Sequence, residues 1–177
     1  PHFKRFDKEH PGRHNVIIWP FVSAFWADAA HSQGFKDIFS FELQNLADLA
    51  LKSNNCFYEI YNSETGAVDG GWQFDHQWHS VHDQTWSATG YIRMIFNNLF
   101  GMRFTPEGLT FNPDVELLNE YGVEKLSNLR YLNGRLNIVI SGKGTKLAAV
   151  KVNGKTQSVK KPIAPTDGIT QIELIIK

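Results

Sequence analysis

The sequence predicts an α+β protein, with helices in residues 1–101 followed by a small antiparallel β-sandwich in residues 102–177. Aromatic residues predict this division, because the first part contains 19 of the 23 Phe, Trp and Tyr residues, including all five Trp. Hydrophobic patterning agrees with it. Apolar residues recur at helical spacing before Gly101, whereas short β-like runs bounded by Gly, Asn and Pro follow it. We therefore expect two domains with these boundaries.

Two helices are expected near the start of the chain. Residues 20–33 begin with Pro20, which suits a first helical position, and carry apolar residues at helical spacing. Residues 35–52 carry a broad apolar face, with Glu42 among the polar residues outside it. Because the link at Gly34 is very short, these two helices should form an antiparallel hairpin.

A long loop and a third helix are expected next. Apolar residues in 53–81 show neither helical nor strand periodicity, which predicts a loop that builds a site or a lid. The third helix should run from Asp83, as its N-cap, to Phe100. Three helices so rich in Trp and Phe cannot cover their own apolar surface. We expect either the C-terminal end of a larger helical fold, cut near Pro1, or a chain that needs a partner.

Strands are expected after Gly101. The β-like runs lie at residues 136–140, 147–152 and 169–176. Asn153 and Gly154 form a strong hairpin signal between β-like segments. Three or four such strands favour the small antiparallel sandwich.

Composition excludes several classes of protein. The chain of 177 residues has 18 Lys and Arg against 18 Asp and Glu, so it lacks the basic excess typical of nucleic-acid binding. We find no run of roughly 18 unbroken apolar residues that would span a membrane. The single cysteine, Cys56, excludes an intrachain disulfide. A buried structural thiol is the expectation for Cys56, although a histidine distant in sequence could lie near it in space.

Glu59 is the first candidate for chemistry. It lies between aromatic residues in F-Y-E-I-Y at 57–61, and apolar neighbours would raise the pKa of its carboxyl. The alternative is that Glu59 points into solvent, as most glutamates do.

Tryptophans and histidines give two further hypotheses. Trp19, Trp72, Trp78 and Trp86 lie at loop-to-helix junctions, where aromatic faces suit sugar rings, although a core role is the usual one for a single Trp. A zinc site is a weaker alternative, because its spacing matches no established zinc motif. Its ligands would be His76, His79 and His82.

Three motifs in order resemble the last part of the (α/α)6, or six-hairpin, glycosidases. They are H-N-x-x-I-W-P at 14–20, F-Y-E-I-Y-N-S-E-T-G at 57–66 and Q-T-W-S-A-T-G-Y-I at 84–92. The resemblance covers residues 13–101 and is nearest to the group of mannosylglycerate hydrolase, trehalase and processing α-glucosidases. It implies helices of an (α/α)6 toroid followed by a β-rich accessory domain. Such relatives are often secreted or periplasmic.

This resemblance implies an inverting hydrolysis of a glycoside, α-linked by analogy, with Glu59 as the general base. The general acid of the family, an Asp in the middle of the barrel, has no counterpart in this sequence, so the chain alone should be inactive. No cofactor or metal is implied, and the expected partners are an oligosaccharide or glycoside and the remainder of the helical barrel. The implied sugar-pocket residues are Trp19, Tyr61, Gln84 and Trp86, with His14 and Asn15 at the rim.

Two other functions stay open. One is a carbohydrate-binding or assembly module that uses the tryptophan faces without hydrolysis. The other is a glycoside phosphorylase on the same barrel, in which phosphate replaces water and no base is needed.

Overall fold

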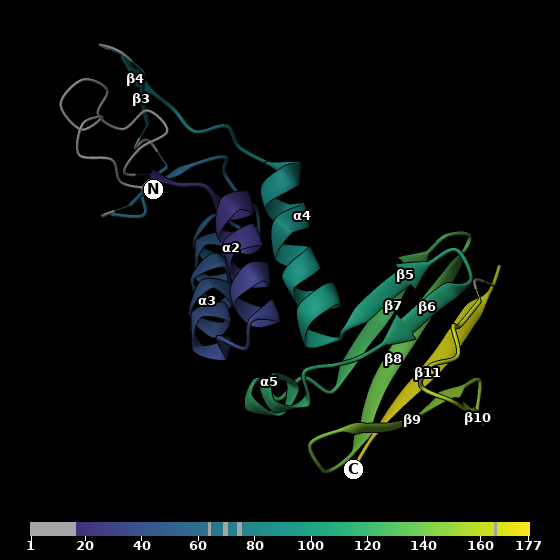
Figure 1. Cartoon of the computed structure of the whole chain (residues 1–177). Coiled ribbons are helices and arrows are strands. Elements are labelled where there is room, and N and C mark those ends of the chain that lie inside the picture. Colours follow the sequence, from purple (N-terminus) through teal and green to yellow (C-terminus); the bar gives the residue numbers. More distant parts are fainter. Residues whose placement is uncertain (1–16, 64, 69–70, 74–75, 165) are drawn as a thin grey trace. The chain divides into compact units, whose positions relative to one another are not determined.

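The computed structural model describes residues 17–63, 65–68, 71–73, 76–164 and 166–177, with the backbone alone for 71–73 and 76–78. It has a mixed α+β fold, in which helices come first and a five-stranded mixed sheet follows (Figure 1). The chain divides into two compact units, Pro1–Met94 and Ile95–Lys177. None of the helices in the described part combines the length and apolar character needed to cross a bilayer.

Three helices build the described part of the first unit, as the sequence predicts. They are α2 (Pro20–Ser32), α3 (Lys36–Lys52) and α4 (Thr85–Arg93). α2 packs against both of the others, and the α2–α3 pair is the expected hairpin, turning at Gly34 with a φ of +83°. Figure 1 shows that α2 and α4 run in the same direction, so their N-terminal ends lie at the same end of the unit.

The end of α4 is wider than an α-helix. The chain continues from Arg93 as a π-helix, η1 (Met94–Leu99), and the amide of Phe100 donates to the carbonyl of Ile95, five residues earlier. The boundary between the two units falls within η1. The predicted third helix is therefore confirmed over residues 85–99, with a change of helix type that its residue spacing does not reveal.

Small residues form the buried face of α2. Ala24, Ala27 and Ala30 are buried, whereas Phe25 and Trp26 are each 55% exposed. On α4, a Cβ atom added at Gly90 would lie 2.9 Å from the Cβ of Ala24. The two helices can approach this closely because neither has a bulky side chain at the contact.

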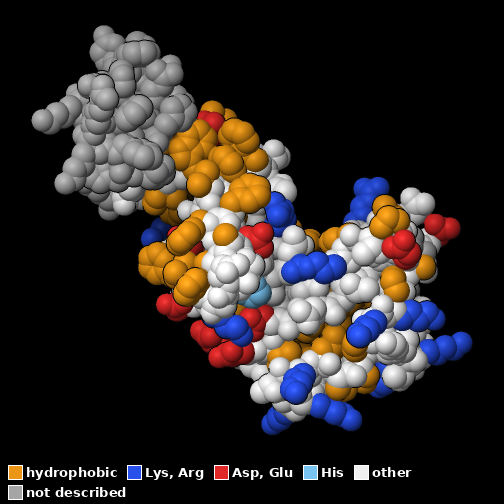
Figure 2. Space-filling model, viewed as in Figure 1, with side chains coloured by type: hydrophobic (Ala, Val, Ile, Leu, Met, Phe, Trp, Pro, Cys, Tyr) orange, Lys and Arg blue, Asp and Glu red, His pale blue; other side chains and the backbone are white. Residues whose placement is uncertain are grey.

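Large apolar side chains consequently remain uncovered on the helical unit, as the sequence predicts. Figure 2 shows hydrophobic side chains gathered on the surface of the helices. Surface of this kind marks sites of association. The exposed members on the helices and the turn between them are Val22, Phe25, Trp26, Phe35, Phe41, Leu51, Trp86 and Ile92.

The predicted N-cap of α4 is wrong. Gln84, not Asp83, occupies the N-cap position, and its side chain makes no capping hydrogen bond. Asp83 has a φ of +57°, and its carboxylate lies 2.7 Å from Nδ1 of His82. The left-handed backbone places Asp83 before the helix, and the carboxylate is engaged by the neighbouring imidazole.

Short strands organise much of the segment predicted as a loop. β1 (Ile17–Ile18) pairs antiparallel with β2 (Tyr61–Asn62), so that Ile18 lies opposite Tyr61. β3 (Gly71–Gln73) pairs with β4 (His76–Trp78) as a second two-stranded ribbon. The rest of the described part of residues 53–81 consists of turns and irregular chain.

The second unit is built on a five-stranded sheet in the order β10-β9-β11-β8-β7. The predicted strands are confirmed, as is the hairpin at Asn153 and Gly154, whose φ angles are both positive. Alternate residues of the central strands, such as Ile138 and Leu174, are fully buried, so one face of the sheet covers a core. The strands are β7 (Lys125–Tyr131), β8 (Gly134–Gly142), β9 (Leu147–Val152), β10 (Lys155–Gln157) and β11 (Ile169–Ile176).

This sheet differs from the expected antiparallel arrangement, because β11 is parallel to β8 and antiparallel to β9. Four elements of this unit were not predicted, and one of them is β7. The hairpin of β5 (Met102–Thr105) and β6 (Gly108–Phe111) bonds to Ile163 through Leu109, and α5 (Val115–Glu120) is capped by Asp114. α5 is too short for its apolar residues to establish a helical period.

We predict that Gly90→Ala destabilises the helical unit. In an open helix, alanine is favoured over glycine by about 1 kcal/mol, but here the added methyl meets Ala24 and the backbone of Phe21. Overpacking of this kind lowers the free energy of unfolding by about 1–3 kcal/mol. Urea denaturation followed by Trp fluorescence measures it, because all five Trp belong to this unit.

Two variants control this measurement. Thr89→Ala changes an exposed neighbour on the same helix and should leave the stability nearly unchanged. Ala24→Gly added to Gly90→Ala should recover part of the loss, giving a favourable coupling free energy in the double-mutant cycle. A Gly90→Ala protein more stable than the wild type would contradict the close contact.

Candidate functional site

Three chain segments meet at the N-terminal ends of α2 and α4. The β1–β2 pair joins the residues before α2 to the segment at Tyr61. The amide of Glu59 donates to the carbonyl of Val81 at 2.9 Å, and the amide of Gln84 donates to Phe57 at 2.8 Å. These bonds bring the segment carrying Glu59 together with the residues that begin both helices.

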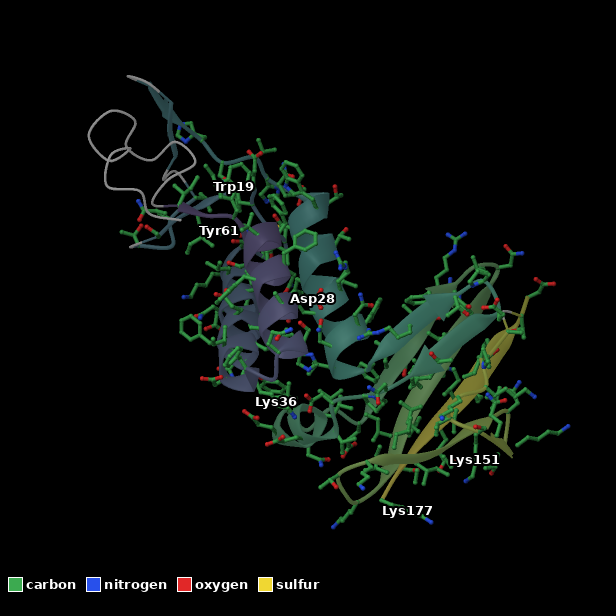
Figure 3. All side chains as sticks on the ribbon, viewed as in Figure 1. Trp19, Asp28, Lys36, Tyr61, Lys151 and Lys177 are labelled. Atoms are coloured by element: carbon green, nitrogen blue, oxygen red, sulfur yellow. The ribbon has the colours of Figure 1, made fainter. Side chains whose placement is uncertain are left out.

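An aromatic cluster lies at this end of the unit. The ring of Trp86, in the first turn of α4, stacks on Phe21 with centroids 5.0 Å apart and planes inclined by 22°. Trp19, the N-cap residue of α2, meets Trp86 edge to face at 6.3 Å. Trp86 is 47% exposed, so its indole also presents surface to the outside. Figure 3 shows Trp19 and Tyr61 at this end of the helices and Lys36 at the opposite end.

Glu59 is half-buried in this region. Its neighbours Phe57 and Ile60 are buried, and the amide of Ile60 donates to the hydroxyl of Ser80 at 2.8 Å. Hydrogen bonds on both sides therefore fix the backbone that carries the carboxyl group. Neither α2 nor α4 has an acidic residue in its first turn, so no carboxylate of the first turn offsets the positive end of either helix dipole.

The predicted pocket residues fall into different positions. Trp19, Gln84 and Trp86 share the region with Glu59, and Gln84 is half-buried. Tyr61 is 1% exposed and offers almost no surface to a ligand. Its hydroxyl accepts from the amide of Tyr58 at 2.9 Å and lies 3.5 Å from the hydroxyl of Ser53, so it holds the loop.

Several other predicted residues cannot be placed. His14 and Asn15 lie outside the described residues, as do the side chains of Trp72, Trp78 and His76. The backbones of Trp72 and Trp78 belong to β3 and β4, so the expected place of these two residues at loop-to-helix junctions is wrong. Of the other predicted zinc ligands, His79 is exposed and His82 contacts Asp83 and Cys56.

The helical unit has a cavity of about 430 Å³ that is lined in part by Glu42 of α3. The sequence predicted that Glu42 lies outside the apolar face of this helix. Glu42 is half-buried against α2, and burial raises the pKa of its carboxyl, partly offset by a hydrogen bond from Ser23. The sequence contains one sign of this cavity, since Glu42, Asn45 and Lys52 are polar residues that share one side of α3. The described lining comprises Ile18, Ser23, Phe41, Glu42, Asn45, Leu46, Asp48, Leu49, Lys52 and Ser63.

Comparison with known proteins gives no relative: no family model matches the chain, and neither does any curated protein sequence. The geometry alone therefore defines what the region offers. It combines a carboxyl group on a fixed loop, partly exposed aromatic rings and an amide side chain at two helix N-termini. Such a set can hold a polar ligand with apolar faces and act on it as a base.

We predict that Tyr61→Phe lowers the free energy of unfolding by about 1–3 kcal/mol, because the amide of Tyr58 loses its acceptor. Urea denaturation measures this loss. Tyr58→Phe is the matched control, since that hydroxyl makes no hydrogen bond in the described part of the structure, and it should change the stability little. An unchanged stability in Tyr61→Phe would contradict a structural role for the hydroxyl.

Glu42→Gln should stabilise the protein at neutral pH. Because the pKa of Glu42 is raised in the folded state, the protonated carboxyl group favours folding and the ionised one opposes it. The stabilisation is complete below the ordinary pKa of the carboxyl group, and it is lost as the pH rises through the pKa of the folded state. The neutral amide avoids this loss. Urea denaturation at several pH values should show a gain at pH 7 that disappears in acid.

Asp48→Asn serves as the control, because it removes an exposed carboxylate from the lining of the same cavity. We expect little change in stability from it. A Glu42→Gln effect that is independent of pH would contradict the assignment to ionisation.

Proposed function

We propose that the helical unit is the C-terminal part of an (α/α)6 glycoside hydrolase that cleaves an α-linked glycoside with inversion. The observation that carries the proposal is the meeting of Glu59, Trp19 and Trp86 at the N-terminal ends of α2 and α4. A carboxyl group and partly exposed indole rings on neighbouring segments are components of a sugar-cleaving site.

Glu59 would act as the general base. In an inverting reaction one carboxylate takes a proton from water on the face of the sugar opposite the leaving group, while a second carboxyl group protonates the leaving oxygen. The two groups are separated by roughly 6.5–9.5 Å to leave room for the water. We assign the second role to a residue of the remaining helical barrel.

The aromatic and amide side chains would bind the sugar. Trp86 presents about half of its surface, and the stack on Phe21 holds the ring in one orientation. C–H faces of a pyranose suit such a ring, and the half-buried amide of Gln84 can exchange hydrogen bonds with hydroxyl groups.

The exposed apolar side chains of the helices support the proposal that further helices complete a barrel. Phe25 and Trp26 on α2, Phe41 on α3 and Ile92 on α4 all leave large apolar areas exposed. Further helical hairpins, in the same or another chain, would cover these areas and close a toroid. The β unit would then be the accessory domain, with the β5–β6 hairpin as a second layer of a sandwich.

We predict that Glu59→Gln, made in the protein that includes the rest of the barrel, lowers kcat for α-linked glycosides by about 10²–10⁴-fold. KM should change little, because the amide keeps the size of the carboxyl group. Proton NMR of the first-formed product should show the inverted anomer in the wild type. Near-normal turnover of Glu59→Gln would remove Glu59 from the mechanism.

Asp37→Asn is the matched control. Asp37 is exposed in the first turn of α3, at the end of the helices opposite Trp19, and should leave kcat and KM unchanged. The experiment also separates the rival functions. Turnover that requires inorganic phosphate would indicate a phosphorylase, and sugar binding without cleavage by the longer protein would indicate a binding module.

A further inference from the structure

Cys56, His82 and Asp83 form a connected chain of side chains. The thiol sulfur of Cys56 lies 3.2 Å from Nε2 of His82, and Nδ1 of the same ring lies 2.7 Å from the carboxylate of Asp83. One ligand atom of each residue lies within 4.8 Å of the others. The expected buried structural thiol is thus a half-buried thiol facing a histidine that is 26 residues away in sequence.

The surroundings hold this chain in place. The ring of Tyr58 meets the imidazole of His82 edge to face at 4.7 Å. The single S–H of Cys56 can donate either to Nε2 of His82 or to the carbonyl of Ser53, which lies 2.7 Å from the sulfur. The loops that carry the two residues are joined by the hydrogen bond between Gln84 and Phe57. Both partners are therefore positioned by the fold rather than by chance contact of mobile side chains.

The order of the contacts determines their chemistry. The Asp83 carboxylate can accept a hydrogen bond from Nδ1–H of His82, and in that tautomer of the neutral imidazole Nε2 is an acceptor directed at the sulfur. A nucleophile, a base within hydrogen-bond reach and a third group that orients the base are the signature of an activated side chain. Among the described residues a metal site fits less well, because the carboxylate of Asp83 lies at Nδ1 of His82, whereas the sulfur of Cys56 lies at Nε2 on the other side of the ring.

We propose that Cys56 is a thiol–disulfide exchange site that accepts one half of a small, low-molecular-mass disulfide, with His82 as its base. The exposed fractions of His82 and Asp83, 52% and 74%, leave the cluster open to such a reagent. The S–H bond of Cys56 breaks and its proton passes to Nε2. The sulfur electron pair forms the new S–S bond as the S–S bond of the reagent breaks.

The leaving thiolate then takes the proton from His82. Cys56 is oxidised to a mixed disulfide, and one half of the reagent is reduced to a free thiol. No further oxidant is needed, and an added thiol reverses the step.

The reaction of the intact chain with 4,4′-dithiodipyridine tests the proposal. Cys56 is the only cysteine, so the absorbance of released thiopyridone reports this site alone. At neutral pH the folded chain should react about tenfold or more faster than the same chain unfolded in guanidinium, because only the folded chain holds Nε2 of His82 where it can accept the proton of the thiol. Equal rates in the two states would overturn the proposal.

Two variants assign the effect to the cluster. His82→Gln should lower the rate of the folded chain about tenfold, and Asp83→Asn, which suits the left-handed backbone, should lower it about threefold. The control His79→Gln changes an exposed histidine outside the cluster and should not affect the rate. Circular dichroism verifies that each variant is folded, and an unchanged rate in folded His82→Gln would refute the role of His82 as the base.

Discussion

The close approach of α2 and α4 is the constraint on which the arrangement of the helical unit depends. Gly90 lies against Ala24 and the backbone of Phe21, and no larger side chain fits at this contact. The contact sets the two helix N-termini side by side, which places Trp86 over Phe21 and within reach of Trp19. A wider helix spacing would separate the aromatic rings and the loop that carries Glu59.

That constraint also accounts for the uncovered apolar surface. When a helix pair is closed by alanines and a glycine, the bulky apolar residues of both helices must lie elsewhere. Phe25 and Trp26 consequently lie outward on α2, and Trp86 and Ile92 are partly exposed on α4. The same distribution that brings the two helices close together thus leaves partly exposed aromatic rings at one end and exposed apolar side chains along the sides.

The helices and the main strands could be predicted from the sequence, whereas their faces and partners could not. Pro20 and Gly34 delimit α2, and Asn153 and Gly154 mark the β9–β10 turn, because these signals are local. The sequence did not reveal which face of α2 is buried. A periodicity argument places large apolar residues inside, whereas in α2 the small residues are buried. The positions of Tyr61, Glu42, Cys56 and His82 depend on contacts distant in sequence, which no local pattern contains. The parallel pairing of β8 and β11 is long-range in the same way.

The place of β11 in the sheet has a consequence for biosynthesis. Residues 169–176 lie between β8 and β9, although they follow both in the chain. Until a ribosome has released this segment, β8 and β9 each present an unpaired edge of amide and carbonyl groups, which other chains can join. The nascent polypeptide therefore depends on β11, which is synthesised after both of its neighbours, to close the sheet, and premature termination ahead of Ile169 would leave both edges open to aggregation.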